Sequence, residues 1–253
     1  MGHLDTYRKN EAYAAFLAGW DEGFYRKYAE ALRPDTPGGR ALDVGCGVGQ
    51  VVRRLTEAGF DAVGIDVSEP CIARARSSGL NCERYEGGRL PYPDKHFDSA
   101  GALNVLEHVE EPEAFIAELV RVVKPGGKVV LSSPNFFRVV GWRDYHPHMR
   151  GVRNKLRNLR RLLAKRREMR TAPDRVRFDR MVPIVKDSFT ADDDAIVATN
   201  GPEMAFFLRR AGCRVERVEC TDRPVHTVID FLLNLTPLRY VMFNAFVLAR
   251  RAD

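Results

Sequence analysis

The sequence predicts an α/β fold in which helices cover both faces of a mostly parallel sheet. Three observations support this prediction. Apolar runs typical of strands alternate with helix-like segments between residues 40 and 135, a glycine-rich turn ("GCGVG") follows the first such run, and a helix and two strands return after residue 200. Alternation at this spacing implies right-handed crossovers between parallel strands. Ligands of such sheets bind at the carboxyl ends of the strands.

The predicted helices and strands follow from the spacing of the apolar residues and from the turn residues between them. A helix is predicted over residues 8–32, because apolar and aromatic side chains recur there at helical spacing. Strands are expected at "RALDVG", "DAVGIDVS", "FDSAGALN" and "KVVLSSPN", with helices at "GQVVRRLTEAG", "EPCIARARSSG" and "PEAFIAELVRVV" between them. The turns "LPYPDKH" and "KPGG" separate elements. The helix "GPEMAFFLRRAG" and the strand "CRVERVEC" precede a short apolar helix near "VIDFLLNL" and a last strand at "RYVMFNAFVLARR".

We divide the chain into four predicted parts. Residues 1–35 form an N-terminal helical cap, and residues 36–135 form the ligand-binding core. Residues 136–200 form an inserted lid with a basic helix, and residues 201–253 complete the core sheet. We expect the insertion to lie over the ligand-binding edge of the sheet, where lids and substrate pockets tend to occur.

Composition limits the class of protein. Of the 253 residues, 45% are hydrophobic and 29% charged, as in a globular chain with a substantial core. The sequence has no uninterrupted apolar run of about 18 residues. It also does not open on a basic region followed by an apolar core, so a cytoplasmic protein is expected. The five cysteines form no C-x-x-C pair, which predicts reduced thiols rather than a zinc site.

The glycine-rich turn constrains the ligand. Dinucleotide enzymes use G-x-G-x-x-G and place a pyrophosphate on the following helix. Here Gly45, Gly47 and Gly49 give G-x-G-x-G, and Asp43 precedes the first glycine by two residues. A carboxylate in that place repels a pyrophosphate but attracts a cationic amino group. We therefore predict a cofactor that carries positive charge near Asp43.

The stretch "LDVGCGVG" resembles the first motif of the class I S-adenosylmethionine-dependent methyltransferases. Four further stretches resemble motifs of that family in the same order: "VGIDVS", "YEGGRLPYPDKHFD", "NVLEHV" and "RVVKPGGKVVLSSPN". The resemblance is dense over residues 35–135 and loose over the last part of the chain. It implies a Rossmann-like, seven-stranded sheet, S-adenosylmethionine as cofactor and S-adenosylhomocysteine as product.

The resemblance also assigns roles to residues. Asp66 would accept hydrogen bonds from both ribose hydroxyls, and Glu86 with Gly87 would meet the adenine, although Glu86 is longer than the more usual Asp. Asp43 and the glycine turn would hold the methionine end. The whole implied cofactor-binding set is Asp43, Gly45, Cys46, Gly47, Gly49, Asp66, Val67, Glu86, Gly87 and Asn104.

Methyl transfer needs few protein groups, because the cofactor brings its own leaving group and orientation supplies much of the rate. A hydroxyl acceptor gains from a general base, and the candidates are His108, His146 and His148. Ordinary structural roles, at a helix start or on a loop, remain open for all three. Some relatives bind a divalent metal through E-x-x-E-H. Asn104 replaces the first glutamate here, so no metal site is predicted.

Two charged stretches need an interpretation. The acid run Asp192-Asp193-Asp194 suits a solvated turn or a helix cap. Residues 145–167 hold nine Lys and Arg and no acid, whereas the whole chain has a net charge of +6. The apolar residues of this basic stretch fall near one face of a helix: Val152, Leu156, Leu159, Leu162 and Leu163.

We expect this basic helix to pack its leucines on the domain and to leave its cations in solvent. Three alternatives stay open: the cations bind an anionic acceptor, residues 150–170 make peripheral contact with an anionic membrane, or the helix binds RNA. RNA is the weakest of them, because no aromatic stacking motif accompanies the charge. Nucleic acid is therefore not the expected partner.

The motif style is similar to that of methyltransferases acting on quinones, sugars and natural products. The expected function is therefore transfer of a methyl group from S-adenosylmethionine to a small-molecule acceptor, with a hydroxyl as the favoured target. N-methylation, action on an anionic lipid or a nucleic acid, and a non-catalytic regulator that binds the cofactor are the alternatives. The sequence predicts no oligomeric state.

Overall fold

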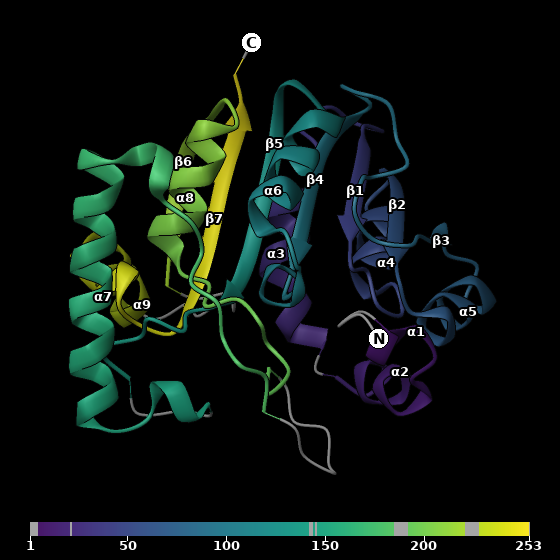
Figure 1. The fold of residues 1–253 in the computed structure, drawn as a ribbon. Helices are drawn as coiled ribbons and strands as arrows, with labels where there is room; N and C mark the ends of the chain where they lie inside the picture. The colour runs from purple at the N-terminus through teal and green to yellow at the C-terminus, as the bar shows by residue number, and fades with distance from the viewer. Residues whose placement is uncertain are drawn as a thin grey trace.

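A computed structural model gives the fold (Figure 1). Helices lie on both faces of one central sheet, and the first two helices, α1 (Asp5–Arg8) and α2 (Glu11–Ala18), lie near its edge strand β3 (Cys82–Arg84). The residues that the structure describes are 5–20, 22–141, 144, 146–184, 192–220 and 228–252.

The described residues form a seven-stranded sheet in the order β3-β2-β1-β4-β5-β7-β6. The first five strands in sequence pair in parallel, and β7 runs antiparallel to both β5 and β6. This topology confirms the predicted Rossmann-like, mostly parallel sheet. The strands are β1 (Arg40–Val44), β2 (Asp61–Asp66), β3 (Cys82–Arg84), β4 (Phe97–Leu103), β5 (Val123–Pro134), β6 (Cys213–Glu219) and β7 (Asn244–Arg251).

Two apolar cores join the helices to the two faces of the sheet. One core holds Tyr28, Val52 and Ile72 and packs α3, α4 and α5 on one face. The other holds Ile116 and Leu208 and packs α6 and α8 on the opposite face. The helices are α3 (Glu22–Leu32), α4 (Gln50–Glu57), α5 (Glu69–Ser77), α6 (Pro112–Val122) and α8 (Gly201–Arg210).

The N-terminal segment differs from the single helix predicted over residues 8–32. The structure has α1 (Asp5–Arg8), α2 (Glu11–Ala18) and then α3. Asn10 caps α2, because its side chain accepts a hydrogen bond from the Tyr13 N–H, and Gly19 ends that helix. The cap at Asn10 starts a new helix and Gly19 ends it. These local signals outweigh the continuous apolar spacing of residues 8–32.

Two strand predictions also need correction. The short edge strand β3 pairs with β2 at Cys82, although no strand was predicted there. The last strand begins at Asn244 rather than near residue 239, because Pro237–Tyr240 form a 3₁₀ turn. Thr236 caps that turn by accepting a hydrogen bond from the Leu238 N–H. The apolar helix expected before it is α9 (Val228–Leu235).

The segment between β5 and α8 has a small core of its own, formed by Phe136, Phe137, Met149, Leu162, Ala195 and Ala198. Its long helix, α7 (Val152–Thr171), packs against α8 at the edge of the molecule, on the left in Figure 1. The buried Asn158 amide ties α7 down by donating to the carbonyls of Phe136 and Arg138.

The expectation that α7 packs its leucines on the domain is wrong for all but one of them. Leu162 is buried, whereas Leu156 and Leu163 are more than half exposed. Asn158 and Leu162 lie one turn apart and define the packed side of the helix, so the remaining apolar row points elsewhere. Among the described helices, none is both long and apolar enough to cross a membrane.

Candidate functional site

A cavity of about 880 Å³ opens at the carboxyl ends of β1, β2 and β4. The loops after these strands line one part of it, and side chains from α2 and α3 line another. Nine of the residues predicted for cofactor binding or catalysis meet here: Asp43, Gly45, Cys46, Gly47, Asp66, Val67, Gly87, Asn104 and His108.

Asp43 lies at the end of β1 with only 3% of its surface exposed. Tyr28 Oη donates to Asp43 Oδ1 over 3.0 Å. Burial raises the pKa of Asp43 to about 7, with the Asp66 carboxylate adding to the rise and the Tyr28 hydrogen bond opposing it. A cation that enters the cavity stabilises the charged form of such a buried carboxyl group. The amino group of the methionine moiety is a cation of this kind.

The glycine turn brings backbone, rather than side chains, to the cavity wall. Gly45 has a φ of +76°, and a Cβ on it would lie 2.2 Å from Val105 Cγ2. The Gly47 N–H donates to Asp66 Oδ2 over 2.8 Å, and the Ser68 N–H donates to Asp66 Oδ1 over 2.8 Å. These two bonds fix the carboxylate at the end of β2, while burial raises its pKa.

Asn104 follows β4 in a left-handed conformation, with a φ of +53°. Its backbone N–H donates to Ser132 O over 2.8 Å. Its side-chain oxygen is buried and has no hydrogen-bond partner among the described residues. A buried acceptor of this kind is costly unless a ligand donor satisfies it. Together with Asp43 and the open glycine turn, this fits a bound S-adenosylmethionine.

Two predicted cofactor residues lie elsewhere. Glu86 is exposed, and its carboxylate pairs with the guanidinium groups of Arg8 and Arg84. It is absent from the lining, although Tyr85, Gly87 and Gly88 on either side of it are present. Gly49 is also absent from the lining.

Gly49 instead starts α4 at a φ of +86°, and a Cβ there would lie 2.6 Å from Leu80 Cδ1. It therefore serves the turn and its packing against the end of α5. The predicted contacts of Glu86 with the adenine and of Gly49 with the methionine end have no support in this geometry.

His108 lines the cavity at the end of a 3₁₀ turn, η1 (Leu106–His108), with 15% of its side chain exposed. Tyr7 Oη lies 3.3 Å from His108 Nδ1 and also donates to the Asp194 carboxylate. Asp194 Oδ2 lies 3.7 Å from Nδ1, and Glu107 Oε1 lies 3.9 Å from Nε2. Both ring nitrogens therefore have a carboxylate nearby.

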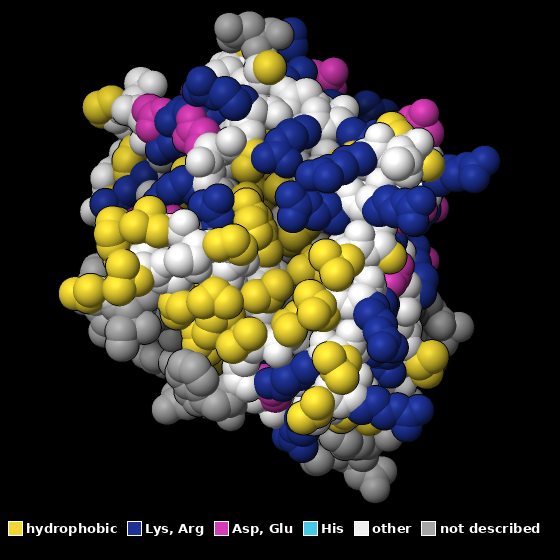
Figure 2. All heavy atoms as spheres, turned by 90° about the vertical axis from the view of Figure 1, so that its left-hand side faces the viewer, with side chains coloured by type: hydrophobic (Ala, Val, Ile, Leu, Met, Phe, Trp, Pro, Cys, Tyr) yellow, Lys and Arg dark blue, Asp and Glu magenta, His cyan; other side chains and the backbone are white. Residues whose placement is uncertain are grey.

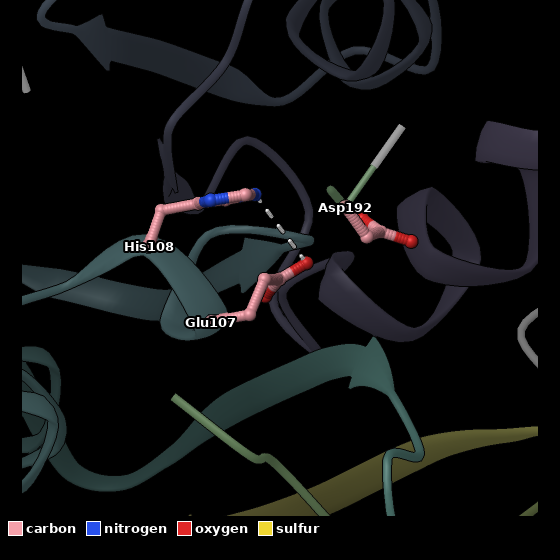
Figure 3. Close-up of side chains that lie close together, drawn as sticks. All are labelled: Glu107, His108 and Asp192. Atoms are coloured by element: carbon pink, nitrogen blue, oxygen red, sulfur yellow. Dashed lines mark ion pairs between the residues drawn. The ribbon is translucent and has the colours of Figure 1, made fainter. Parts of the chain in front are cut away.

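Glu107 is fully buried, and Ser133 Oγ lies 2.9 Å from its Oε2. Its pKa is raised well above the ordinary value, mainly by burial and then by the negative charge of Asp192. Its backbone carbonyl accepts from the N–H groups of Ile196 and Val197, which holds the end of the 136–200 segment beside η1. Figure 3 shows Glu107 and His108 facing each other with Asp192 beside them.

These three side chains could hold a cation. One ligand atom from each of Glu107, His108 and Asp192 lies within 4.8 Å of the others. Two carboxylates and an imidazole suit a divalent transition metal. The prediction of no metal site assumed that Asn104 left the motif one carboxylate short. Asp192, distant in sequence, supplies a second carboxylate in the folded chain.

The acid run is not the solvated turn that was predicted. Asp192 and Asp193 are 9% and 7% exposed, and Asp192 and Asp194 line the cavity. Neither Asp192 nor Asp194 was predicted from the sequence as a site residue. The apolar run "AIVAT" directly after the acids is the available signal, because it anchors them in the interior. The aromatic lining from the N-terminal helices was also missed: Tyr7, Tyr13, Phe16, Trp20, Phe24 and Tyr25.

His146 and His148 are not brought to the cavity. His146 is 1% exposed, and its ring packs edge-on against Phe136 at 5.1 Å. Its Nδ1 accepts from the His148 N–H over 3.3 Å, which caps the turn η2 (Pro147–Met149). Burial lowers the pKa of His148, with Arg157 and Arg161 adding to the effect. The structure thus gives both histidines a place in the small core of the 136–200 segment, not a base position.

The charge of the cavity is negative. Its described lining has a single Lys or Arg, Arg89, against seven acids: Asp43, Asp66, Glu110, Glu111, Glu118, Asp192 and Asp194. No described residue of α7 belongs to the lining. The cations of α7 are therefore not placed to receive an anionic acceptor in this cavity.

Residues 42–131 match the methyltransferase domain family. The demethylmenaquinone methyltransferase of Tropheryma whipplei (strain Twist) is 27% identical over 217 residues, which cover 82% of this chain and 78% of that protein. The ubiquinone biosynthesis O-methyltransferase of Methylococcus capsulatus is 38% identical over 105 residues. That second alignment covers 39% of this chain and 44% of the relative.

A solved S-adenosylmethionine-dependent methyltransferase from Mesorhizobium loti has the same fold, with a TM-score of 0.58 and 21% identity. The superposition covers 93% of this chain and 100% of that one. The matched domain, the sheet order and the cavity at the carboxyl edge all agree with the motifs in the sequence. The chain therefore contains a methyltransferase domain, and its fold and cavity are those of the class I S-adenosylmethionine-dependent methyltransferases.

Proposed function

We propose that the protein methylates a hydroxyl group of a neutral, ring-bearing small molecule, such as a phenol or a quinol. The observation that carries this proposal is His108, which lines the cavity with a carboxylate near each ring nitrogen. Bound S-adenosylmethionine supplies an electrophilic methyl group on a sulfonium that is itself the leaving group. The protein has to orient the acceptor and remove its proton.

His108 acts as the general base in this proposal. As the acceptor oxygen attacks the methyl carbon, the imidazole takes the hydroxyl proton, the new C–O bond forms and the old C–S bond breaks. The Asp194 carboxylate, 3.7 Å from Nδ1, stabilises the imidazolium. The proton passes to solvent when the product leaves.

The lining favours a neutral aromatic acceptor. Phe16, Trp20 and Phe24 offer ring faces and edges to a planar molecule. A phenol has a pKa near 10, as tyrosine does, so an imidazole can deprotonate it more easily than a sugar hydroxyl. The excess of acids in the lining opposes an anionic acceptor. We further propose that residues 1–35 act as the cap that encloses this acceptor.

The names of two relatives support the same class. One is a ubiquinone biosynthesis O-methyltransferase and the other a demethylmenaquinone methyltransferase. Both names refer to quinone-type molecules, and the first refers to oxygen as the methylated atom.

An amine acceptor is the second candidate, and the negative lining is the observation that favours it. Seven acids against one arginine attract a protonated amine into the cavity. The amine must then lose its proton before it can attack the methyl group, and His108 in the cavity lining is placed to accept it.

The test is an acceptor panel assayed by release of S-adenosylhomocysteine. Catechols, hydroquinones, sugars and aromatic amines are compared, with the product analysed for O-methyl or N-methyl. We expect turnover with phenolic hydroxyls. His108→Asn should lower kcat by roughly 10²- to 10⁴-fold with little change in KM. It should also remove the fall in rate at low pH that a histidine base produces.

His148→Asn is the matched control, because it removes an imidazole outside the cavity, and its kcat should stay within about twofold. Equal losses for the two variants would contradict a base role for His108. Activity lost in EDTA and restored by Mn²⁺ would instead assign Glu107, His108 and Asp192 to a metal. Cofactor binding without turnover on any acceptor would favour a non-catalytic regulator.

A further inference from the structure

The helix α7 has an apolar row that the described part of the protein leaves largely exposed, with Leu159 the most covered member at 36%. Val152, Leu156, Leu159 and Leu163 recur at intervals of four, three and four residues, so they share one side of the helix. Val152 is 74% exposed, Leu156 52% and Leu163 58%. The packed side is a different one, marked by the buried Asn158 and Leu162.

A second helix exposes apolar side chains on the same side of the molecule. In α9, Phe231 is 65% exposed, Leu232 53% and Leu235 64%. Both helices lie at the left-hand edge of the molecule in Figure 1, and Figure 2 looks directly at that edge. It shows hydrophobic side chains gathered around a hollow, with Lys and Arg side chains around them. We call the exposed apolar and basic side chains of α7 and α9 the α7–α9 face.

The charge of this face is strongly positive. Within α7, nine Lys and Arg residues stand against Glu168 alone, whereas the whole chain carries a net charge of +6. The rest of the chain is therefore net negative. Six arginines of α7 are exposed and form no ion pair with any described residue: Arg153, Arg157, Arg160, Arg166, Arg167 and Arg170.

The remaining cations of α7 have internal roles. Lys155 pairs with Asp144, Arg161 with Asp179, and Lys165 with both Asp179 and the buried Glu203. These pairs fix the helix to the protein. Fixed in this way, α7 presents its apolar row and its free arginines as one preformed surface.

We propose that the α7–α9 face docks on the surface of an anionic phospholipid bilayer. A helix with an apolar side and many Lys and Arg residues lies in the membrane interface, where its apolar side chains enter the acyl boundary and its cations meet lipid phosphates. Large apolar side chains that are exposed together on one face mark an interaction site.

Charge selects the bilayer over other occupants. A second copy of the chain would bring the same six arginines against these, which opposes self-association through this face. RNA would leave the apolar row exposed to water, because nucleic-acid phosphates contact cations and not leucines. The docking uses no residue of the cavity, so it stands independently of the proposed acceptor.

The experiment is co-sedimentation of the full-length protein with vesicles of phosphatidylcholine alone or with an anionic lipid, phosphatidylglycerol, added. We expect binding only to the anionic vesicles and weaker binding as salt rises. The triple variant Arg153→Gln, Arg157→Gln, Arg160→Gln should lower the partition coefficient by about 100-fold, since each cation near the surface contributes about a factor of five.

A second variant tests the apolar part. Leu156→Gln with Leu163→Gln should reduce partitioning by about tenfold or more, because two exposed leucines no longer enter the acyl boundary. Both sites are exposed, so the variant should keep its thermal midpoint. The matched control removes three exposed arginines of other helices, Arg26→Gln, Arg53→Gln and Arg209→Gln, and should bind like the unchanged protein.

Three results would overturn the proposal. The first is a folded protein that does not bind anionic vesicles. The second is equal loss in the control and in the α7 charge variant, which would assign binding to net charge rather than to this face. The third is a stable dimer in solution that the leucine variant converts to a monomer, which would assign the face to a second copy.

Discussion

The cavity and the α7–α9 face have opposite charge and opposite exposure. The cavity gathers seven acids and one arginine around the buried carboxyl ends of the parallel strands. The α7–α9 face presents six arginines that pair with no described residue, and an exposed apolar row, on helices at the edge of the molecule. Because no described residue of α7 lines the cavity, the small-molecule cavity and the proposed docking surface belong to different parts of the chain.

The glycine turn offers the largest expected effect on the cavity. Gly45→Ala places a Cβ 2.2 Å from Val105 Cγ2 in a left-handed conformation. Strain and overpacking together should cost about 3–5 kcal/mol and abolish detectable binding of S-adenosylhomocysteine. Gly38→Ala has the same left-handed strain, at a φ of +69°, but no atom within 4 Å of the new Cβ.

That control should lose about 1–2 kcal/mol and retain binding. Thermal unfolding and calorimetric titration measure both quantities. Similar losses of stability and binding in the two variants would mean that backbone strain alone, rather than the close approach to Val105, requires glycine at residue 45.

Asp66 and Glu86 test which of the predicted carboxylates binds the cofactor, because Asp66 lines the cavity and Glu86 does not. Asp66→Ala should weaken S-adenosylhomocysteine binding by roughly 10- to 100-fold, as expected for loss of a charged hydrogen-bond acceptor. Glu86→Ala should change it by less than about threefold, because that carboxylate is exposed and paired with Arg8 and Arg84. A large effect of Glu86→Ala in titration calorimetry would bring this residue back to the adenine site.

Asp43 makes cofactor binding depend on pH. Its folded pKa of about 7 lies above the ordinary value of 3.8. Protonation therefore favours the folded, ligand-free protein, and the stability that it contributes is lost as pH rises from about 4 through 7. Asp43→Asn should thus raise the thermal midpoint more at pH 8 than at pH 5.

The cationic amino group of the cofactor requires the charged carboxylate. Affinity for S-adenosylhomocysteine should then fall by up to about tenfold per pH unit below 7. Asp43→Asn should bind more weakly at pH 8 and lose this dependence. A wild-type affinity that stays flat between pH 5 and 8 would contradict the assigned contact.

The smallest expected effect tests the separation of the two regions. Arg153→Gln, Arg157→Gln, Arg160→Gln should leave kcat/KM for a water-soluble acceptor within about twofold of the unchanged protein, because none of the three lines the cavity. The measurement is steady-state release of S-adenosylhomocysteine. A loss of tenfold or more would show that the basic helix takes part in acceptor binding after all.

The cavity-lining residues at the carboxyl ends of β1 and β2 were largely predictable from sequence. Gly45 and Gly47 meet a conformational requirement of the backbone turn. Asp43 and Asp66 meet an electrostatic requirement beside that turn. Alternation of strands and helices places the ends of the parallel strands together, so such residues meet whatever the rest of the chain does. Glu86 shows the limit, because a loop side chain can turn to solvent and find arginines there.

The acceptor half was not predictable in the same way. His108, His146 and His148 have the same chemistry in the sequence, yet packing sends one to the cavity and two into a small core. Tyr7 and Asp194 contact His108 although both are distant from it in the sequence. Such contacts depend on how segments pack, and no local pattern encodes them.

By itself, the sequence determined the α/β class, the resemblance to methyltransferases and the glycine turn at the cavity wall, because these depend on hydrophobic periodicity, on local motifs and on local backbone requirements. Only the tertiary structure decided that Asp192 and Asp194 enter the cavity and that the leucines of α7 face outward. The physical reason is that helical spacing defines which side chains share a side of α7, but not which side is buried. Asn158, Leu162 and their partners in the 136–200 core decide that.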